Sequence, residues 1–394
     1  MTRVGYRSYE NSVGNASSLR AGSPLSNRTT AHIWPGDPSL HQVYGPATRT
    51  LAAGFISYGL HVRVIETAVK DSAMRPGLLR VLHSSVRPGD LFVSISRSVQ
   101  GVPWQWLRSK GVYRVSYSTD LGMCRQLRGR EELIDELWSY TRADLEICKE
   151  VLPGTPLRAV PPGFVPPRVE MQAQCAGCSL GAWDRLQSAA SGSELDEGAA
   201  PEPVFFLGSA KPVKRARCLA TLNATTFASS LMVKVVWRKD QLAKLINAHS
   251  FALNIHRECG ACDASAARKT PDGDARFFQC LKHTPVEFFR LADLLSAGVH
   301  VVSEMGHPDD MVSLKGIVSF ARTLGDMPRV FHEAVRAERQ APTGAHSRLG
   351  ASMDGHMGWR TRSMLRIQHA YIARFQPAVL LRKAGFGELL TSPT

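Results

Sequence analysis

Residues 204–217 read VFFLGSAKPVKRAR and contain the most informative local pattern in the chain. The first four residues are apolar and predict a buried strand, and the basic residues that end the stretch predict the start of a helix. Between them, Gly208 and Ser209 form a turn where backbone can approach a ligand closely. Helix N-terminal amides attract anions, and Lys214 and Arg215 add positive charge. The stretch predicts a phosphate site, and its alternative is an ordinary turn before a solvated basic helix.

Apolar runs and helical patterns alternate on both sides of this stretch, which predicts parallel sheets with helices on both faces. Upstream, we expect helices and strands in turn: helices at Ala47–Tyr58, Ala73–His83, Trp104–Ser109 and Glu131–Val151, and strands at His32–Trp34, His61–Ile65, Asp90–Ile95 and Val112–Tyr117. Downstream, we expect strands at Met232–Trp237, Phe251–Ile255, Val299–Val302 and Gly316–Phe320, and helices at Gln241–Ala248, Val286–Ala297 and Ala321–Val335. The predicted fold class is α/β, with two Rossmann-like doubly wound domains facing a cleft.

Changes in composition predict the domain boundaries. The first thirty residues are rich in Ser, Arg and Asn with a single acid, and indicate a disordered tail or, as the alternative, an organellar transit peptide. Apolar positions in the last part of the chain predict one amphipathic closing helix over Arg360–Phe386. The expected parts are a leader at 1–30, a first domain at 31–165, a linker or insertion at 166–202, a second domain at 203–345 with an insert at 257–284, and a helical tail at 346–394.

The composition limits the class of protein. Of the 394 residues, 44% are hydrophobic and 21% are charged, which suffices for packed cores. No run approaches the roughly 18 apolar residues that a membrane-spanning helix needs. The net charge of +14 favours phosphorylated or polyanionic ligands. Because the basic residues are spread along the chain rather than clustered with aromatic residues, a nucleic-acid-binding protein is the less favoured alternative.

The cysteine content points to an intracellular protein. Eight cysteines in a chain of this length do not make a disulfide scaffold, and the leader has no secretory signal. We therefore expect reduced thiols and a soluble, cytoplasmic chain. In that interpretation the Asn-x-Ser/Thr sequences at Asn15, Asn27 and Asn223 carry little weight.

One group of cysteines has the spacing of a metal site. The insert contains two cysteines two residues apart, followed by a third cysteine and a histidine, a pattern that fits a tetrahedral zinc site. The four ligands would be Cys259, Cys262, Cys280 and His283. Ordinary surface thiols are the favoured alternative, so we expect no cofactor.

The segment 251–256, FALNIH, ends an apolar run with polar residues. Because side chains alternate along a strand, Asn254 and His256 fall on the same side. His256 lies near the carboxyl end of the strand, where open parallel sheets bind ligands. We expect both side chains to face a ligand, and the alternative is a boundary histidine without a function.

The segment 286–304 contains polar residues at helical spacing before a β-branched strand. Glu287, Arg290 and Asp293 follow one another at intervals of three, which brings them to one side of a helix that ends at Gly298. We expect this side to line the ligand site. The alternative is a surface ion pair between Glu287 and Arg290, of little energetic value.

Three motifs of the second domain, taken in chain order, resemble the C-terminal half of GT-B glycosyltransferases of the broad family-1 and family-4 group. They are FLGS with a basic helix start, LNIH, and E-x-x-R-x-x-D-x-L-x-x-G followed by VVSE. More faintly, Ser118-Thr-Asp120, Trp138–Asp144 and Val160–Phe164 resemble segments of the N-terminal half. The resemblance covers about residues 110–320.

The resemblance implies a metal-independent glycosyltransferase with a nucleotide diphosphate sugar as donor and a glycan, lipid or protein as acceptor. The acceptor would bind to the first domain and the donor to the second. The usual first acid of the family pattern falls on Pro285, so the alternative is a degenerate relative that binds a nucleotide sugar or glycan without turnover. The implied donor contacts are Gly208, Ser209, Lys214, Arg215, Asn254, His256, Arg290, Asp293 and Glu304, and the implied catalytic residues are Glu287 and Asp120, the latter as an acceptor-side base.

Overall fold

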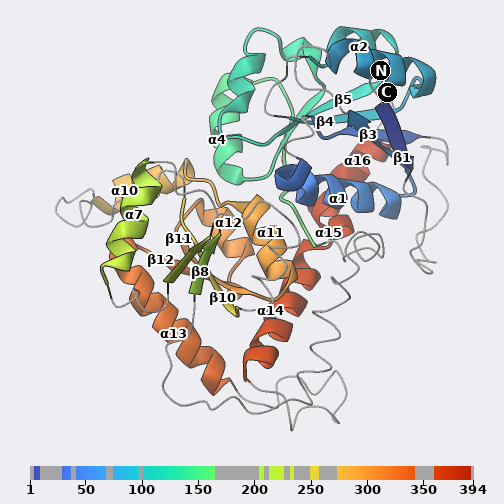
Figure 1. The fold of residues 1–394 in the computed structure, drawn as a ribbon. Coiled ribbons are helices and arrows are strands. Elements are labelled where there is room, and N and C mark those ends of the chain that lie inside the picture. The colour runs from blue at the N-terminus through green and yellow to red at the C-terminus, as the bar shows by residue number, and fades with distance from the viewer. Residues whose placement is uncertain are drawn as a thin grey trace, which may run out of the picture. The chain divides into compact units, whose positions relative to one another are not determined.

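The computed structural model divides the chain into two compact units, residues 1–165 with 374–394, and residues 166–373. Each unit is a mainly parallel sheet covered by helices, so the predicted α/β class is confirmed (Figure 1). No helix in the part of the chain that the structure describes is long and apolar enough to cross a bilayer. The structure describes residues 4–8, 29–36, 41–67, 74–96, 99, 101–164, 204–207, 213–225, 231–234, 249–256, 273–341 and 359–391.

The N-terminal unit is built on a seven-stranded sheet in the order β1-β3-β2-β4-β5-β6-β7. All neighbouring strands are parallel except β1 and β3, which are antiparallel. The central strands are buried on both faces, as expected for strands between two helical layers. The strands are β1 Val4–Ser8, β2 Thr30–Trp34, β3 His61–Thr67, β4 Leu91–Ser96, β5 Tyr113–Ser118, β6 Glu136–Ser139 and β7 Leu157–Ala159.

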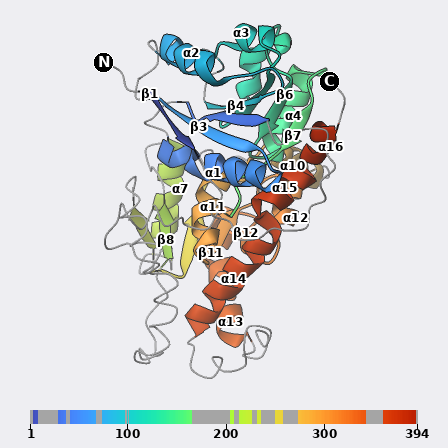
Figure 2. The same ribbon diagram turned by 90° about the vertical axis from the view of Figure 1, so that its right-hand side faces the viewer.

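Helices cover both faces of this sheet. Figure 2 shows α2 and α3 on one face and α1 on the other. Leu82 of α2, Leu107 of α3 and Cys148 of α4 belong to one buried apolar cluster with strand residues such as Phe92. The helices are α1 His41–Ser57, α2 Met74–Ser85, α3 Trp104–Ser109 and α4 Arg142–Val151, with 3₁₀ turns η3 Met123–Leu127 and η4 Glu131–Leu133.

The prediction of one helix over Glu131–Val151 is wrong. The segment holds a 3₁₀ turn, then strand β6, then α4, which begins after Thr141. Thr141 has an extended backbone and its side chain accepts a hydrogen bond from the Ala143 amide, the geometry of a helix N-cap. Leu137 and Trp138 are fully buried where β6 pairs with β5. Tertiary burial therefore overrides the helical pattern of this segment.

The C-terminal unit has a five-stranded, all-parallel sheet in the order β12-β11-β10-β8-β9. Chain order reverses between β8 and β10, because β9 lies on one side of β8 while β10, β11 and β12 follow on the other. Open α/β sheets bind ligands at the carboxyl ends of strands at such a switch point. The strands are β8 Val204–Leu207, β9 Leu231–Lys234, β10 Phe251–Asn254, β11 His300–Glu304 and β12 Val318–Ala321.

The helices of the C-terminal unit cover this sheet as well. Apolar residues of α7 and α13, among them Leu222 and Phe331, join one buried cluster with Phe251 and Val302. The predicted helix at Gln241–Ala248 lies outside the described residues. The helices are α7 Val213–Asn223, α10 Gly273–Lys282, α11 Phe288–Ser296, α12 Pro308–Ser313, α13 Met327–Gln340 and α14 Trp359–Phe375, with a 3₁₀ turn, η6 Leu324–Asp326, before α13.

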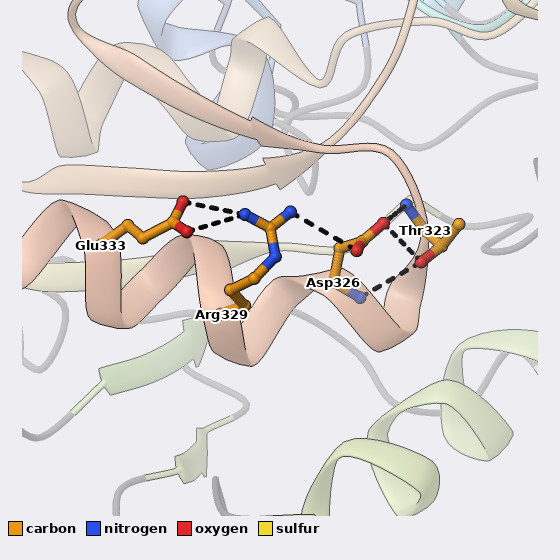
Figure 3. A network of polar contacts seen from close by, with 4 residues as sticks. All are labelled: Thr323, Asp326, Arg329 and Glu333. Atoms are coloured by element: carbon orange, nitrogen blue, oxygen red, sulfur yellow. Dashed lines mark hydrogen bonds and ion pairs between the residues drawn. The ribbon is translucent and has the colours of Figure 1, made fainter.

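A side-chain network joins η6, the turn that leads into α13, to the first turns of that helix (Figure 3). Thr323 Oγ1 accepts a hydrogen bond from the Asp326 amide at 3.1 Å, and Asp326 Oδ2 accepts one from the Thr323 amide at 3.1 Å. This reciprocal arrangement is a capping box at the start of η6, and it supplies hydrogen bonds to the amides of Thr323 and Asp326. Arg329 then donates to Glu333 at 2.8 Å, one turn further along α13. These contacts hold η6 against the start of α13.

The tail is not the single closing helix predicted over Arg360–Phe386. After α14 the chain forms two short helices, α15 Pro377–Lys383 and α16 Phe386–Thr391. Pro377 stands at the first turn of α15 and cannot continue α14, since it has no amide hydrogen. Residues from Arg374 onward belong to the N-terminal unit. There Arg158 donates to the Ala384 carbonyl and also to Glu136, at 2.7 Å.

The expectation of reduced thiols is wrong for every cysteine that the structure describes. Cys124 and Cys148 form a disulfide that joins η3 to α4. Both residues are fully buried. Cys218 of α7 and Cys280 of α10 are also disulfide-bonded. Sequence spacing could not predict the pairing of Cys124 with Cys148, because these residues meet only after folding.

Candidate functional site

Polar side chains gather at the carboxyl ends of β8, β10 and β11, next to the switch point of the C-terminal sheet. They come from the start of α7, from the ends of β10 and β11, and from the first turn of α11. Most are buried, which is unusual for charged groups without a functional or structural role. The residues of this cluster, called the switch-point cluster below, are Phe206, Arg215, Asn254, His256, Glu287, Arg290, Ser303 and Glu304.

Asn254 is the central member of the switch-point cluster. It is the last residue of β10, is fully buried, and pairs in register with Ser303 of the neighbouring strand β11. The Asn254 amide nitrogen donates to Ser303 Oγ at 3.0 Å, and its oxygen accepts from Arg290 Nη1 at 2.5 Å. Ser303 in turn donates to the Glu304 carbonyl. Asn254 thus links the sheet to the guanidinium of α11.

Arg290 presents its guanidinium at the sheet edge. Besides its bond to Asn254, Nη1 lies 3.4 Å from the Ile255 carbonyl, and the guanidinium carbon lies 5.5 Å from the centre of the Phe206 ring. Burial lowers the pKa of Arg290, while the charge of Glu287 acts in the opposite direction; arginine stays protonated in either case. Among the described residues no group accepts a hydrogen bond from Nε or Nη2 of Arg290.

Arg215 brings a second guanidinium to the same aromatic ring. Its side chain is buried, its Nε donates to the His256 carbonyl at 3.4 Å, and its guanidinium carbon lies 5.7 Å from the centre of the Phe206 ring. Its Nη2 lies 3.9 Å from a carboxylate oxygen of Glu287. Two cations against one ring form a setting in which cation–π attraction offsets part of their mutual repulsion.

His256 and Glu304 complete the switch-point cluster. The His256 amide donates to the Glu304 carboxylate at 2.7 Å, and His256 Nε2 lies 3.1 Å from the Met305 carbonyl. A carbonyl only accepts, so Nε2 carries the hydrogen. Nδ1 of His256 is buried and has no hydrogen-bond partner among the residues that the structure describes. In its neutral form, the imidazole would offer the Nδ1 lone pair to a donor such as a hydroxyl group.

The structure brings together six of the side chains expected at the donor site, from four elements or their ends: Arg215, Asn254, His256, Glu287, Arg290 and Glu304. Pro285 stands where the family pattern has its first acid, and it lies two residues before Glu287 of this cluster. Sequence reasoning missed Phe206 and Ser303. The in-register pairing of Asn254 with Ser303 was the only signal for Ser303, and it is a property of the sheet.

The remaining residues expected at the donor site are Asp293, Lys214, Gly208 and Ser209. Burial raises the pKa of Tyr371 on α14, and the charge of Asp293 in α11 adds to this effect. Lys214 is exposed on the first turn of α7. Gly208 and Ser209 lie outside the described residues.

Asp120, the expected acceptor-side base, belongs to the N-terminal unit. Its carbonyl accepts a hydrogen bond from Ser118 at 3.0 Å, just after strand β5. The nearby carboxyl of Asp144 is fully buried and accepts from the Gly122 amide at 2.6 Å. Burial raises the pKa of Asp144, and the charge of Asp120 adds to this effect. These contacts hold the loop after β5 in place.

The residues of the expected zinc site are only partly described. Cys259 and Cys262 lie outside the described residues, and His283 is exposed just after α10. Cys280 is disulfide-bonded, so its sulfur is not a thiolate and offers no bond to zinc. Cys124, Asp144 and Cys148 also lie close together, but both sulfurs are in the disulfide.

Comparisons with known proteins find likenesses in structure only. No family model and no curated protein matches the sequence. The Anabaena protein HepE, solved with UDP and glucose, is 8% identical, covers 93% of this chain and 100% of its own, and has a TM-score of 0.48. Sucrose-phosphate synthase from Thermosynechococcus elongatus is 11% identical over 92% of this chain and 99% of its own, with a TM-score of 0.48.

A third likeness is of the same kind. A glycosyltransferase from Rickettsia africae is 7% identical over 92% of this chain and 98% of its own, with a TM-score of 0.49. Identities of this size do not transfer the role of any residue. The function of the chain is therefore inferred from the side chains described above.

Proposed function

We propose that the chain is a glycosyltransferase whose donor is a nucleotide diphosphate sugar, bound at the carboxyl ends of β8 and β10. The observation that carries this proposal is the guanidinium of Arg290. Asn254 holds it at 2.5 Å through Nη1, and its Nε and Nη2 donate to no described residue. Two parallel N–H groups match two oxygens of a phosphate, so this edge of Arg290 suits a diphosphate.

The other residues of the switch-point cluster have complementary roles in this proposal. Arg215 adds a second positive charge, which would offset the charge that builds on the departing nucleoside diphosphate. The guanidinium groups would do this without a metal ion. The Nδ1 lone pair of His256 would accept a hydrogen bond from a sugar or ribose hydroxyl, since phosphate oxygens cannot donate.

The experiment that tests the proposal is calorimetric titration of the full chain with UDP, GDP, ADP and their glucose conjugates. Arg290→Lys keeps the charge but removes the two-pronged donor, and we expect it to weaken nucleotide binding about tenfold or more. The matched control is Arg329→Lys on the exposed surface of α13, which should bind as the unchanged chain does. If no nucleotide diphosphate binds, or if both variants bind equally well, the proposal is wrong.

A second measurement separates an enzyme from a degenerate relative. The chain is incubated with radiolabelled forms of whichever nucleotide sugar binds, together with glycan, lipid and peptide acceptors, and release of nucleoside diphosphate is followed. Turnover supports the transferase, whereas binding with no turnover supports a protein that only recognises a nucleotide sugar.

A further inference from the structure

The disulfides change the interpretation of the Asn-x-Ser/Thr sequences, which the proposed function does not use. Every described cysteine is disulfide-bonded. Two of these four cysteines belong to the N-terminal unit and two to the C-terminal unit. Cys124 and Cys148 are fully buried, so their disulfide must form while the chain folds, before the core closes around it. Disulfides of this kind form in oxidising compartments, where Asn-x-Ser/Thr sequences become substrates for N-linked glycosylation.

The sequence Asn223-Ala-Thr225 lies where a glycan has room. Asn223 is the last residue of α7 and is exposed. Ala216 and Ala220 precede it by seven and three positions, so they share its helix face, and both are exposed as well. The exposed positions that precede Asn223 on that face, Ala216 and Ala220, are therefore small and uncharged.

The position of Asn223 in the fold keeps a glycan away from the proposed donor site. Helix α7 starts at the carboxyl edge of the sheet, where Arg215 contacts the His256 carbonyl. It then runs back to the amino edge, because β9 is parallel to β8. Asn223 lies eight residues beyond Arg215, about 12 Å along the helix axis. A glycan at Asn223 and a ligand at the switch-point cluster are thus compatible.

We infer that the chain matures in an oxidising compartment and carries an N-linked glycan on Asn223. In this step the Asn223 side-chain nitrogen loses a proton and forms a bond to C1 of the first sugar. The sugar comes from a lipid-linked diphospho-oligosaccharide, and the lipid diphosphate is the leaving group. The inference does not depend on the proposed transferase activity.

The test is production of the full chain in human cells behind a cleavable secretion signal. The tryptic peptide that contains Asn223 is treated with peptide N-glycosidase in heavy-oxygen water and examined by mass spectrometry, which separates this position from Asn15 and Asn27. We expect labelled aspartate at position 223 in the unchanged chain and in Thr225→Ser, and none in Thr225→Ala. Because the glycan is attached during synthesis, chain retained in the cell can be examined as well.

A second measurement tests whether the described cysteines pair when the chain matures in an oxidising compartment. Alkylation under denaturing conditions, without reductant, should leave Cys124, Cys148, Cys218 and Cys280 unmodified in the secreted or retained chain. An unglycosylated Asn223 in the chain that has entered the secretory pathway, or alkylation of these four cysteines, overturns the inference.

Discussion

Replacement of Asn254 tests how the switch-point cluster is built, because this buried side chain links strand β11 to Arg290. Asn254→Ala removes one hydrogen bond to a charged group, at 2.5 Å, and one to a neutral hydroxyl, at 3.0 Å. Bonds to charged groups contribute about 1.5–3 kcal/mol and neutral bonds about 0.5–1.5 kcal/mol. We expect the free energy of opening around β10 to fall by roughly 2–4 kcal/mol.

Asn254→Asp separates stability from ligand binding. A carboxylate in this place still accepts from Arg290, and the Ser303 hydroxyl can turn to donate to it, so the loss of stability should be about 1 kcal/mol. The new negative charge, however, cancels the charge of the guanidinium that the proposal assigns to the diphosphate. Nucleotide binding should therefore weaken about tenfold or more, which corresponds to about 1.4 kcal/mol.

Two measurements read these effects separately. Hydrogen exchange of peptides that cover β10 reports local opening, which is preferable to a global melting curve in a chain of two units. Calorimetric titration with the nucleotide that the unchanged chain binds reports affinity. The reasoning fails if Asn254→Ala leaves exchange at β10 unchanged, or if Asn254→Asp binds nucleotide as tightly as the unchanged chain.

Three further predictions concern stability. Glu338 is buried, and although burial raises its pKa, hydrogen bonds from His300 and Arg366 lower it overall from 4.5 to about 2. The Glu338 carboxylate should therefore add on the order of 3 kcal/mol to the free energy of unfolding above pH 4.5, and this contribution is lost as the pH falls toward 2. Acid unfolding of the unchanged chain should show this pH dependence, and that of Glu338→Gln should not. Thr323→Ala removes the cap of η6, the turn that leads into α13, and should lower the free energy of unfolding in urea by about 1 kcal/mol, whereas Thr323→Ser should cost little. Replacing Cys124 and Cys148 together by serine should lower stability by about 2–4 kcal/mol, and equal unfolding midpoints with and without the disulfide would contradict this.

The elements that the sequence predicted best were those whose pattern is local. The apolar run at 251–255 and the β-branched run at 299–302 correspond to β10 and β11, because such runs have few other ways to be buried. The helix over Glu131–Val151 was predicted wrongly. Part of this segment forms strand β6 because it pairs with β5, which lies about twenty residues earlier in the chain. Periodicity within one segment cannot register such a contact.

The candidate site shows the same division. Asn254, His256, Glu287, Arg290 and Arg215 were expected near one another, because polar residues at the ends of apolar strands and on one helix side converge at a sheet edge. Asp293 shares the predicted helix side, yet its charge acts on Tyr371. Helical spacing assigns a residue to a face but does not say what packs against each turn.

The amino-acid sequence by itself determined the α/β class, the alternation of strands and helices, and the polar residues available at the strand ends, because these depend on the order of residues over short distances. Only the tertiary structure decided the strand order that places a switch point between β8 and β10, the register that joins Asn254 to Ser303, and the pairing of Cys124 with Cys148. Each of these joins groups far apart in the chain, and their proximity follows from burial of apolar surface by the whole unit rather than from any local pattern.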